Sequence, residues 1–141
     1  MADYYGVNYT KFNTPTPANK VNGSEYGSGV KWIHDSYEAA GVVKGSSIYI
    51  GKVPQGVFIL PESRIYHDAL GGSSELAVGT AVAGVELSAA EDTSSAGDIQ
   101  LGGDVDSFGT ATTAETDIIV TVSGSGAITG TLRLSLCYAA L

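Results

Sequence analysis

Apolar and polar positions alternate most regularly in the last part of the chain. Between residues 128 and 138 every second position is apolar or glycine, and the positions between them are mostly polar. A period of two over about ten residues predicts a β-strand with one face in a hydrophobic core. Residues 117–122 predict a preceding strand, and the Ser-Gly-Ser-Gly run at 123–126 predicts a hairpin loop. We expect this hairpin to run through the middle of a sheet. The positions expected in the core are Ile128, Leu132, Leu134, Leu136 and Tyr138.

Five shorter stretches upstream also have the pattern of strands. They are separated by turn signals, such as Val53-Pro54-Gln55-Gly56 and the Gly-Gly-Ser-Ser run at 71–74. No stretch has the pattern of a helix long enough to cover a sheet. About seven or eight short strands without such a helix predict an all-β fold, an antiparallel β-sandwich of jelly-roll-like form. The upstream strands are expected at 30–37, 46–52, 57–60, 64–68 and 76–78.

The stretch from Ala89 to Thr113 has the least regular pattern. Its residues are mostly small, polar or acidic, with room for one short strand at 99–101. We expect a long exposed excursion here, because such loops run over the surface of a domain.

Residues 1–29 predict an extended N-terminal arm, followed by a β-sandwich domain at 30–141. The prolines at 15 and 17 favour an extended path, and the glycines between 23 and 29 favour a hinge. Two alternatives remain open. The arm packs back on its own domain as an edge strand, or its aromatic side chains contact a neighbouring subunit, since tyrosine is enriched at protein interfaces. The candidate contact residues are Tyr4, Tyr5, Tyr9 and Phe12.

The charge of the chain is acidic and unevenly distributed. Its 15 acidic and 7 basic residues give a net charge of −8, which argues against a nucleic-acid partner. Residues 1–64 hold six of the basic residues, whereas residues 65–141 hold one basic and ten acidic residues. Either the acidic part simply keeps the surface hydrated, or the near-neutral first part docks on a partner while the acidic part faces water.

No targeting or membrane segment is expected. The start of the chain has neither the basic residues nor the apolar run of a secretory signal. The most apolar window, 76–87, is far shorter than the ~20 residues that cross a bilayer. We therefore expect synthesis in a cytoplasm and no membrane partner.

No group of residues predicts catalysis, a cofactor or a metal site. A nucleophile needs an oriented base, and the candidate bases are His34 and His67, without a G-x-S-x-G motif. Cys137 lies in a regular strand, where a small core filler is expected. The acidic residues of the excursion lack the spacing and the closing glutamate of an EF-hand calcium loop. Those residues are Asp98, Asp104 and Asp106.

Several runs of the chain together resemble a family of small virion proteins of tailed bacteriophages, comprising capsid decoration (cement) and head-fibre-type proteins. The longest run reads IYIGKVPQGVFILPES, at 48–63. This chain has Val53-Pro54 where the family pattern has Leu-Pro, and residues 1–29 lie outside the pattern. The other runs are YHDALG at 66–71, LAVG at 76–79, AETDIIVT at 114–121, AITGTL at 127–132, and Tyr138.

The resemblance implies a non-enzymatic protein that decorates and stabilises an assembled phage head in many copies. The implied partner is the major capsid protein, the implied location is the capsid surface of the virion, and homo-oligomers, with a trimer as the expected form, are common in such proteins. The alternative is a head or tail fibre or spike component that binds host surface glycans through residues 89–113.

Overall fold

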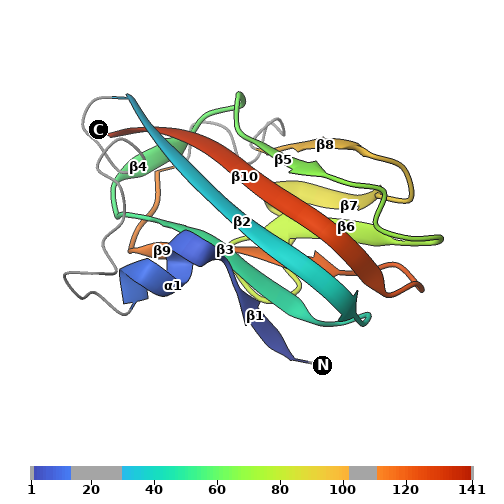
Figure 1. Cartoon of the computed structure of the whole chain (residues 1–141). Coiled ribbons are helices and arrows are strands. Elements are labelled where there is room, and N and C mark those ends of the chain that lie inside the picture. The colour runs from blue at the N-terminus through green and yellow to red at the C-terminus, as the bar shows by residue number, and fades with distance from the viewer. Residues whose placement is uncertain (1, 14–29, 102–110, 141) are drawn as a thin grey trace.

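A computed structural model of the chain describes residues 2–13, 30–101 and 111–140. The described residues form ten β-strands and one short helix (Figure 1). Their bounds are β1 Asp3–Tyr5, α1 Val7–Asn13, β2 Val30–Val42, β3 Ser47–Val53, β4 Val57–Ile59, β5 Arg64–His67, β6 Glu75–Gly79, β7 Ser88–Asp92, β8 Gly97–Gln100, β9 Thr116–Val122 and β10 Ile128–Ala140.

The strands build two sheets. One has the order β1-β3-β9-β6-β7, and the other has the order β2-β10-β5-β8. β4 also pairs with β10, at residues 138–140, which follow the residues of β10 that pair with β5. Neighbouring strands are antiparallel, except that β1 runs parallel to β3. The prediction of an all-β antiparallel sandwich is confirmed.

The hydrophobic core contains the inward positions of both sheets. β10 contributes the five positions that its alternation predicts, and all five are buried. Burying a leucine stabilises a fold by about 1.5–3 kcal/mol, so β10 is a major source of core stability. Other strands also contribute buried residues to the core, among them Ile48, Ile65, Leu76, Ile99 and Val120.

The predicted hairpin between 117–122 and 128–138 is wrong. β9 and β10 are both present, but β9 pairs with β3 and β6, whereas β10 pairs with β2 and β5. The loop at 123–126 therefore crosses from one sheet to the other. One of its two glycines, Gly124, is explained by a close approach and not by a tight turn: a Cβ on Gly124 would lie 2.5 Å from the backbone nitrogen of Glu75. The loop needs a residue without a side chain to pass this close to β6.

The excursion predicted from Ala89 to Thr113 is more regular than expected. Most of its first half is in β7 and β8, which lie at the edges of the two sheets. β8 pairs in register with β5, and Ile99 opposite Ile65 is fully buried. The part at 102–110 lies outside the described residues. The short strand expected at 99–101 overlaps β8, whereas β7 was not expected, because four of its five residues are exposed and show no alternation.

The extended arm predicted for 1–29 needs correction over its first half. Asp3–Tyr5 is a strand on the edge of β3, and Val7–Asn13 is a helix that contacts β2 and β3. We call residues 3–13 the N-terminal segment. The alternative in which the arm packs back as an edge strand therefore describes this segment, while residues 14–29 lie outside the described part of the chain. The helix ends two residues before Pro15, in keeping with the restriction that proline places on the preceding residue.

Within the described residues, no helix has the length and apolar character needed to span a membrane.

Candidate functional site

The candidate contact residues of the N-terminal segment have different environments. Tyr5 is half exposed, Tyr9 is buried, and Tyr4 is partly buried against the core. The side chain of Phe12, the fourth candidate, lies outside the described part of the structure. Of the three described tyrosines, Tyr5 is therefore the one whose side chain remains largely exposed to solvent.

Tyr4 attaches β1 to the interior. Its ring lies 5.8 Å from the ring of Tyr37 on β2, at an interplanar angle of 54°. Such a tilted arrangement is favourable for aromatic pairs. Tyr4 therefore links the edge of one sheet to the edge strand of the other.

Tyr5, Tyr9 and Tyr49 form an aromatic cluster on the outer side of the sheet. Tyr5 lies beside Tyr49 of β3 because these two residues are register partners. The ring centroids of Tyr5 and Tyr49 are 5.2 Å apart, and Tyr9 lies 5.6 Å from Tyr5 and 5.7 Å from Tyr49. The cluster holds α1 against β1 and β3. Tyr5 and Tyr9 were candidates from the sequence, whereas Tyr49 was not, because its position in a strand gave no sign of this contact.

Lys52 closes the cluster on the other side of Tyr9. Its ammonium group lies 5.2 Å from the centroid of the Tyr9 ring, a cation–π contact. The same group donates a hydrogen bond to Asn13 at 3.0 Å. It also forms ion pairs with Glu115 at 3.3 Å and Asp117 at 3.7 Å. One cation thus connects the end of α1 to β9 and to the residue before it.

The electrostatics of this group agree with the geometry. Burial by itself would lower the pKa of Lys52, but the hydrogen bond to Glu115 and the charge of Asp117 outweigh it, so the pKa is raised. Burial raises the pKa of the Tyr9 hydroxyl, and the charge of Asp117 adds to this rise. At neutral pH Tyr9 is neutral and Lys52 carries the positive charge that the cation–π contact requires.

A bulge in β3 brings Lys52 to this side. The β3–β9 register shifts between Tyr49 and Lys52, and Gly51 has a φ of 88°. A β-bulge adds one residue to a strand and so changes which side chains share a face. Because of it, Tyr49 and Lys52 lie on the same outer face. Gly51 suits the position since glycine adopts positive φ freely, and a Cβ there would lie 2.6 Å from Leu134.

Asp35 of β2 fixes the start of α1. It is buried, and its carboxylate accepts a hydrogen bond of 3.1 Å from the backbone N–H of Tyr9, the third residue of the helix. Its other oxygen accepts the N–H of Ser36 at 2.8 Å. Helices begin with unpaired N–H groups, and a carboxylate there is favourable. The capping group comes from the sandwich and not from the sequence that precedes the helix. The start of α1 is therefore stabilised by the surface on which the helix docks.

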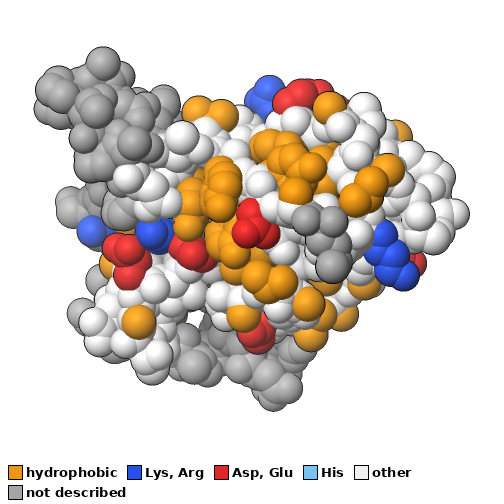
Figure 2. Space-filling model, turned by 90° about the horizontal axis from the view of Figure 1, so that it is seen from below, with side chains coloured by type: hydrophobic (Ala, Val, Ile, Leu, Met, Phe, Trp, Pro, Cys, Tyr) orange, Lys and Arg blue, Asp and Glu red, His pale blue; other side chains and the backbone are white. Residues whose placement is uncertain are grey.

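Figure 2 shows the side of the molecule on which α1 and β1 lie in Figure 1. Hydrophobic side chains gather across the middle of this face, with acidic side chains among them. In the N-terminal segment, the exposed large hydrophobic residues are Tyr5 and Val7, at 50% and 51% exposure. These two side chains lie close together in the sequence, at the end of β1 and the start of α1.

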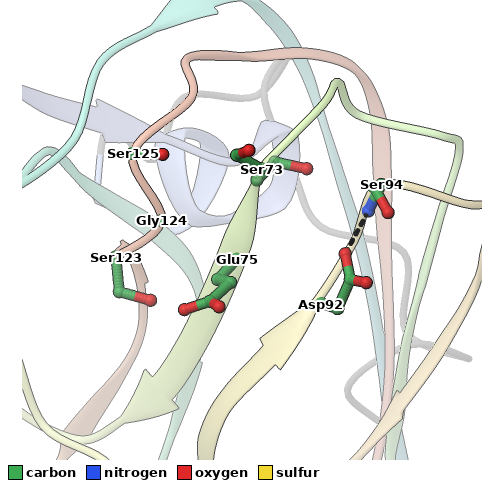
Figure 3. A pocket seen from close by; sticks show the side chains of 8 residues that line it. Ser73, Glu75, Asp92, Ser94, Ser123, Gly124 and Ser125 are labelled. Atoms are coloured by element: carbon green, nitrogen blue, oxygen red, sulfur yellow. Dashed lines mark hydrogen bonds between the residues drawn. The ribbon is translucent and has the colours of Figure 1, made fainter.

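A polar pocket of about 540 Å³ lies elsewhere, beside β6, β7 and the loop between β9 and β10 (Figure 3). Glu75 and Asp92 oppose each other in the β6–β7 register. The backbone N–H and the hydroxyl of Ser94 stabilise the Asp92 carboxylate and lower its pKa. The remaining lining residues are Ser73, Ser74, Ser123, Gly124 and Ser125. Such a lining can hydrogen-bond a hydroxyl-rich ligand and provides no aromatic face for stacking.

The residues that were considered for catalysis and metal binding are buried or paired with other groups of the fold. Cys137 is buried, and burial raises the pKa of its thiol, which disfavours the reactive thiolate. His67 is buried with Nδ1 2.8 Å from the carbonyl of Asp68. Asp98 pairs with Arg64 at 2.5 Å, whereas residues 104 and 106 lie outside the described part. Among the described residues, no three His, Cys, Asp or Glu side chains gather as metal ligands would.

Two solved structures share this fold. A chain in the capsid of Ralstonia phage GP4 superposes with a TM-score of 0.66 at 22% identity, covering 79% of this chain and 84% of that one. A chain in the capsid asymmetric unit of cyanophage Pam1 gives a TM-score of 0.65 at 18% identity, covering 86% of this chain and 94% of that one. No protein-family model and no curated protein sequence matches this chain. At these identities the likeness establishes the fold.

Proposed function

We propose that this chain is a non-enzymatic structural protein of a phage virion, which decorates and stabilises the capsid shell through contacts of its N-terminal segment. The observation that carries the proposal is the likeness of most of this chain to chains from two phage capsids. The covered shares are similar on both sides of each comparison, so each neighbour is a chain of about this size. A single small sandwich suits a protein added to a shell.

The strand order supports the jelly-roll form that we propose for the sandwich. Without β1 and β4, eight strands remain in two sheets of four, β2-β10-β5-β8 and β3-β9-β6-β7. Eight strands in two sheets, built from two Greek keys, define a jelly roll. The first and last of these strands, β2 and β10, are neighbours, as are β3 and β9, so the chain folds back on itself as a long double hairpin.

The proposed partners are the major capsid protein and further copies of this chain, with a trimer as the expected oligomer and the capsid surface as the location. The exposed Tyr5 and Val7 are the proposed contact residues, together with Phe12. Tyrosine combines a large apolar area with a hydroxyl group and is common among residues that dominate binding energy.

The test measures binding to undecorated heads of the phage that encodes the chain, by co-sedimentation. Replacing Tyr5 by alanine should weaken binding at least about tenfold, as expected for a residue that contributes more than about 1.4 kcal/mol. Tyr66→Ala is the matched control, because Tyr66 is also 50% exposed but lies on β5 of the other sheet. Equal binding by both variants would argue against the contact role of the segment. Failure of the unmodified chain to bind heads would reject decoration itself.

A second candidate is a fibre or spike component that binds host surface glycans. The polar pocket favours it, because two of its residues, Asp92 and Ser94, belong to the stretch 89–113 that this alternative requires. A glycan array probed with the purified chain tests it. Binding that Asp92→Asn abolishes would support this function, while an array without any bound glycan would speak against it.

A further inference from the structure

The N-terminal segment has little stability of its own. Its helix has seven residues and its strand has three. Isolated helices shorter than about 12–15 residues are marginal in water. The segment is therefore ordered by the surface on which it docks, and it can leave that surface without breaking a folded unit.

The docking surface belongs entirely to the sandwich. The edge of β3 accepts β1 through Ser47, whose N–H donates to the carbonyl of Ala2 at 3.1 Å, and through Tyr49, whose carbonyl accepts the N–H of Gly6 at 2.6 Å. Asp35 caps the helix, and Lys52 holds Tyr9 and Asn13. Every copy of the chain carries the same surface.

The described side chains of the segment are not part of the sandwich core. None of them belongs to the cluster of buried hydrophobic residues between the sheets, and Tyr4 packs against that cluster from outside. Tyr9, although buried, lies in the outer aromatic cluster. If the segment undocks, the contacts between the segment and the sandwich are lost, but the described core residues between the sheets stay packed.

The chain between the segment and the sandwich is long enough for the segment to reach the docking surface of a second copy. Residues 14–29 of the sequence join Asn13 to Val30. Sixteen residues can span roughly 50 Å when extended. For a flexible connection of such a length, the effective concentration of a segment near its own acceptor is on the order of millimolar. A second copy at a similar local concentration competes on equal terms, because the contacts made are the same.

We propose that the N-terminal segment of one copy docks on the β3 edge, Asp35 and Lys52 of a second copy when copies are crowded together. This inference rests on the proposed function for its setting, since decoration places many copies side by side on a shell. The exchange links neighbours without any surface beyond the one described.

Disulfide trapping in the full chain tests the exchange. Asp3 and Ser47 are register partners on adjacent strands, a separation of ~5 Å that suits a disulfide. The variant Asp3→Cys is mixed with ¹⁵N-labelled Ser47→Cys and oxidised with diamide at about 20 μM and about 2 mM, concentrations on either side of the tether's effective value. Mass spectrometry measures the yield of the mixed disulfide between the two variants. As a control, Asp3→Cys is mixed with Ser125→Cys, whose cysteine lies in an exposed loop, and the disulfide formed there gives the yield from random collision.

The expected result is a mixed Asp3–Ser47 disulfide that rises more than about tenfold between the two concentrations and well exceeds the Ser125 control at the higher one. A yield equal to that control at 2 mM would overturn the proposal. The double variant Asp3→Cys/Ser47→Cys should close within one chain at 20 μM, and failure to do so would overturn the docking geometry itself. If the closed double variant binds heads as well as the unmodified chain, the exchange is rejected while decoration stands.

Discussion

At the level of single residues, Asp35 serves a helix although it lies in a strand. Its carboxylate is buried, and it accepts the N–H of Tyr9 at the start of α1. The alternation around it in the sequence would place an apolar residue at this inward position. The reason for a carboxylate becomes visible once α1 is seen to begin against β2, because the first N–H groups of a helix need acceptors.

Replacing Asp35 by alanine should release the N-terminal segment and leave the sandwich folded. The loss of a helix-capping carboxylate costs about 0.5–2 kcal/mol, which is a large part of what a seven-residue helix can gain by docking. Amide hydrogen exchange measures the effect at Tyr9 and Thr10, where protection should fall several-fold. Glu38→Ala, at an exposed position of the same strand, is the matched control. Unchanged protection in the Asp35 variant would contradict the capping role.

At the level of elements, β1 and α1 attach to the sandwich as one unit, through polar and aromatic contacts on the outer face of β3. We call this set of contacts the attachment. Tyr9 is the central member, since it contacts Tyr5, Tyr49 and Lys52. The bulge at Gly51 makes this possible by bringing Lys52 to the outer face of β3. An attachment of this kind depends on the protonation states of the groups that form it.

The attachment should loosen in alkaline solution. The pKa values of Tyr9 and Lys52 are both raised in the folded chain. Groups with a raised pKa contribute stability that is complete below their ordinary values, near pH 10, and is lost as the pH rises through the raised values. Near-UV circular dichroism of the tyrosines between pH 8 and pH 12 should therefore show a transition above about pH 10.

Tyr9→Phe is the control for the alkaline transition. Phenylalanine keeps the ring and its contact with Lys52 but has no hydroxyl to ionise, so the transition should move to higher pH. A transition at the same pH in both proteins would show that Tyr9 does not take part in it.

At the level of the whole molecule, the sandwich and the N-terminal segment are separable. Among the described side chains, none from the segment belongs to the core between the sheets, whereas the segment exposes Tyr5 and Val7 to solvent. This division is the one on which the proposed decoration function relies.

Deleting residues 1–29 should leave a folded sandwich. We expect cooperative unfolding with a free energy lowered by about 1–3 kcal/mol, which corresponds to exposing the site where Tyr9 is buried. Urea titration followed by the fluorescence of Trp32 measures it, and dispersed amide NMR signals confirm the fold. A deletion variant without a cooperative transition would show that the segment is part of the core after all.

The local pattern of the sequence determined most of the strands and, for β10, the side that is buried. Regular alternation identified β10 and its five core positions, and short apolar runs between turn residues identified β3, β4 and β6. Side-chain direction along a strand depends on period alone, so this part needed no tertiary information. The pattern also led to a β-sandwich, because no long helix was available to cover a sheet.

Partner choice between strands was decided by the tertiary structure. Residues 117–122 and 128–138 are neighbours in sequence, yet β9 and β10 lie in different sheets, and only the passage of Gly124 against β6 explains the loop between them. The attachment site is non-local for the same reason: Tyr9, Asp35, Lys52 and Asp117 lie far apart in the chain and meet on one surface. The sequence by itself determined which faces are apolar, and the tertiary structure decided which of them meet, because pairing depends on contacts between distant residues.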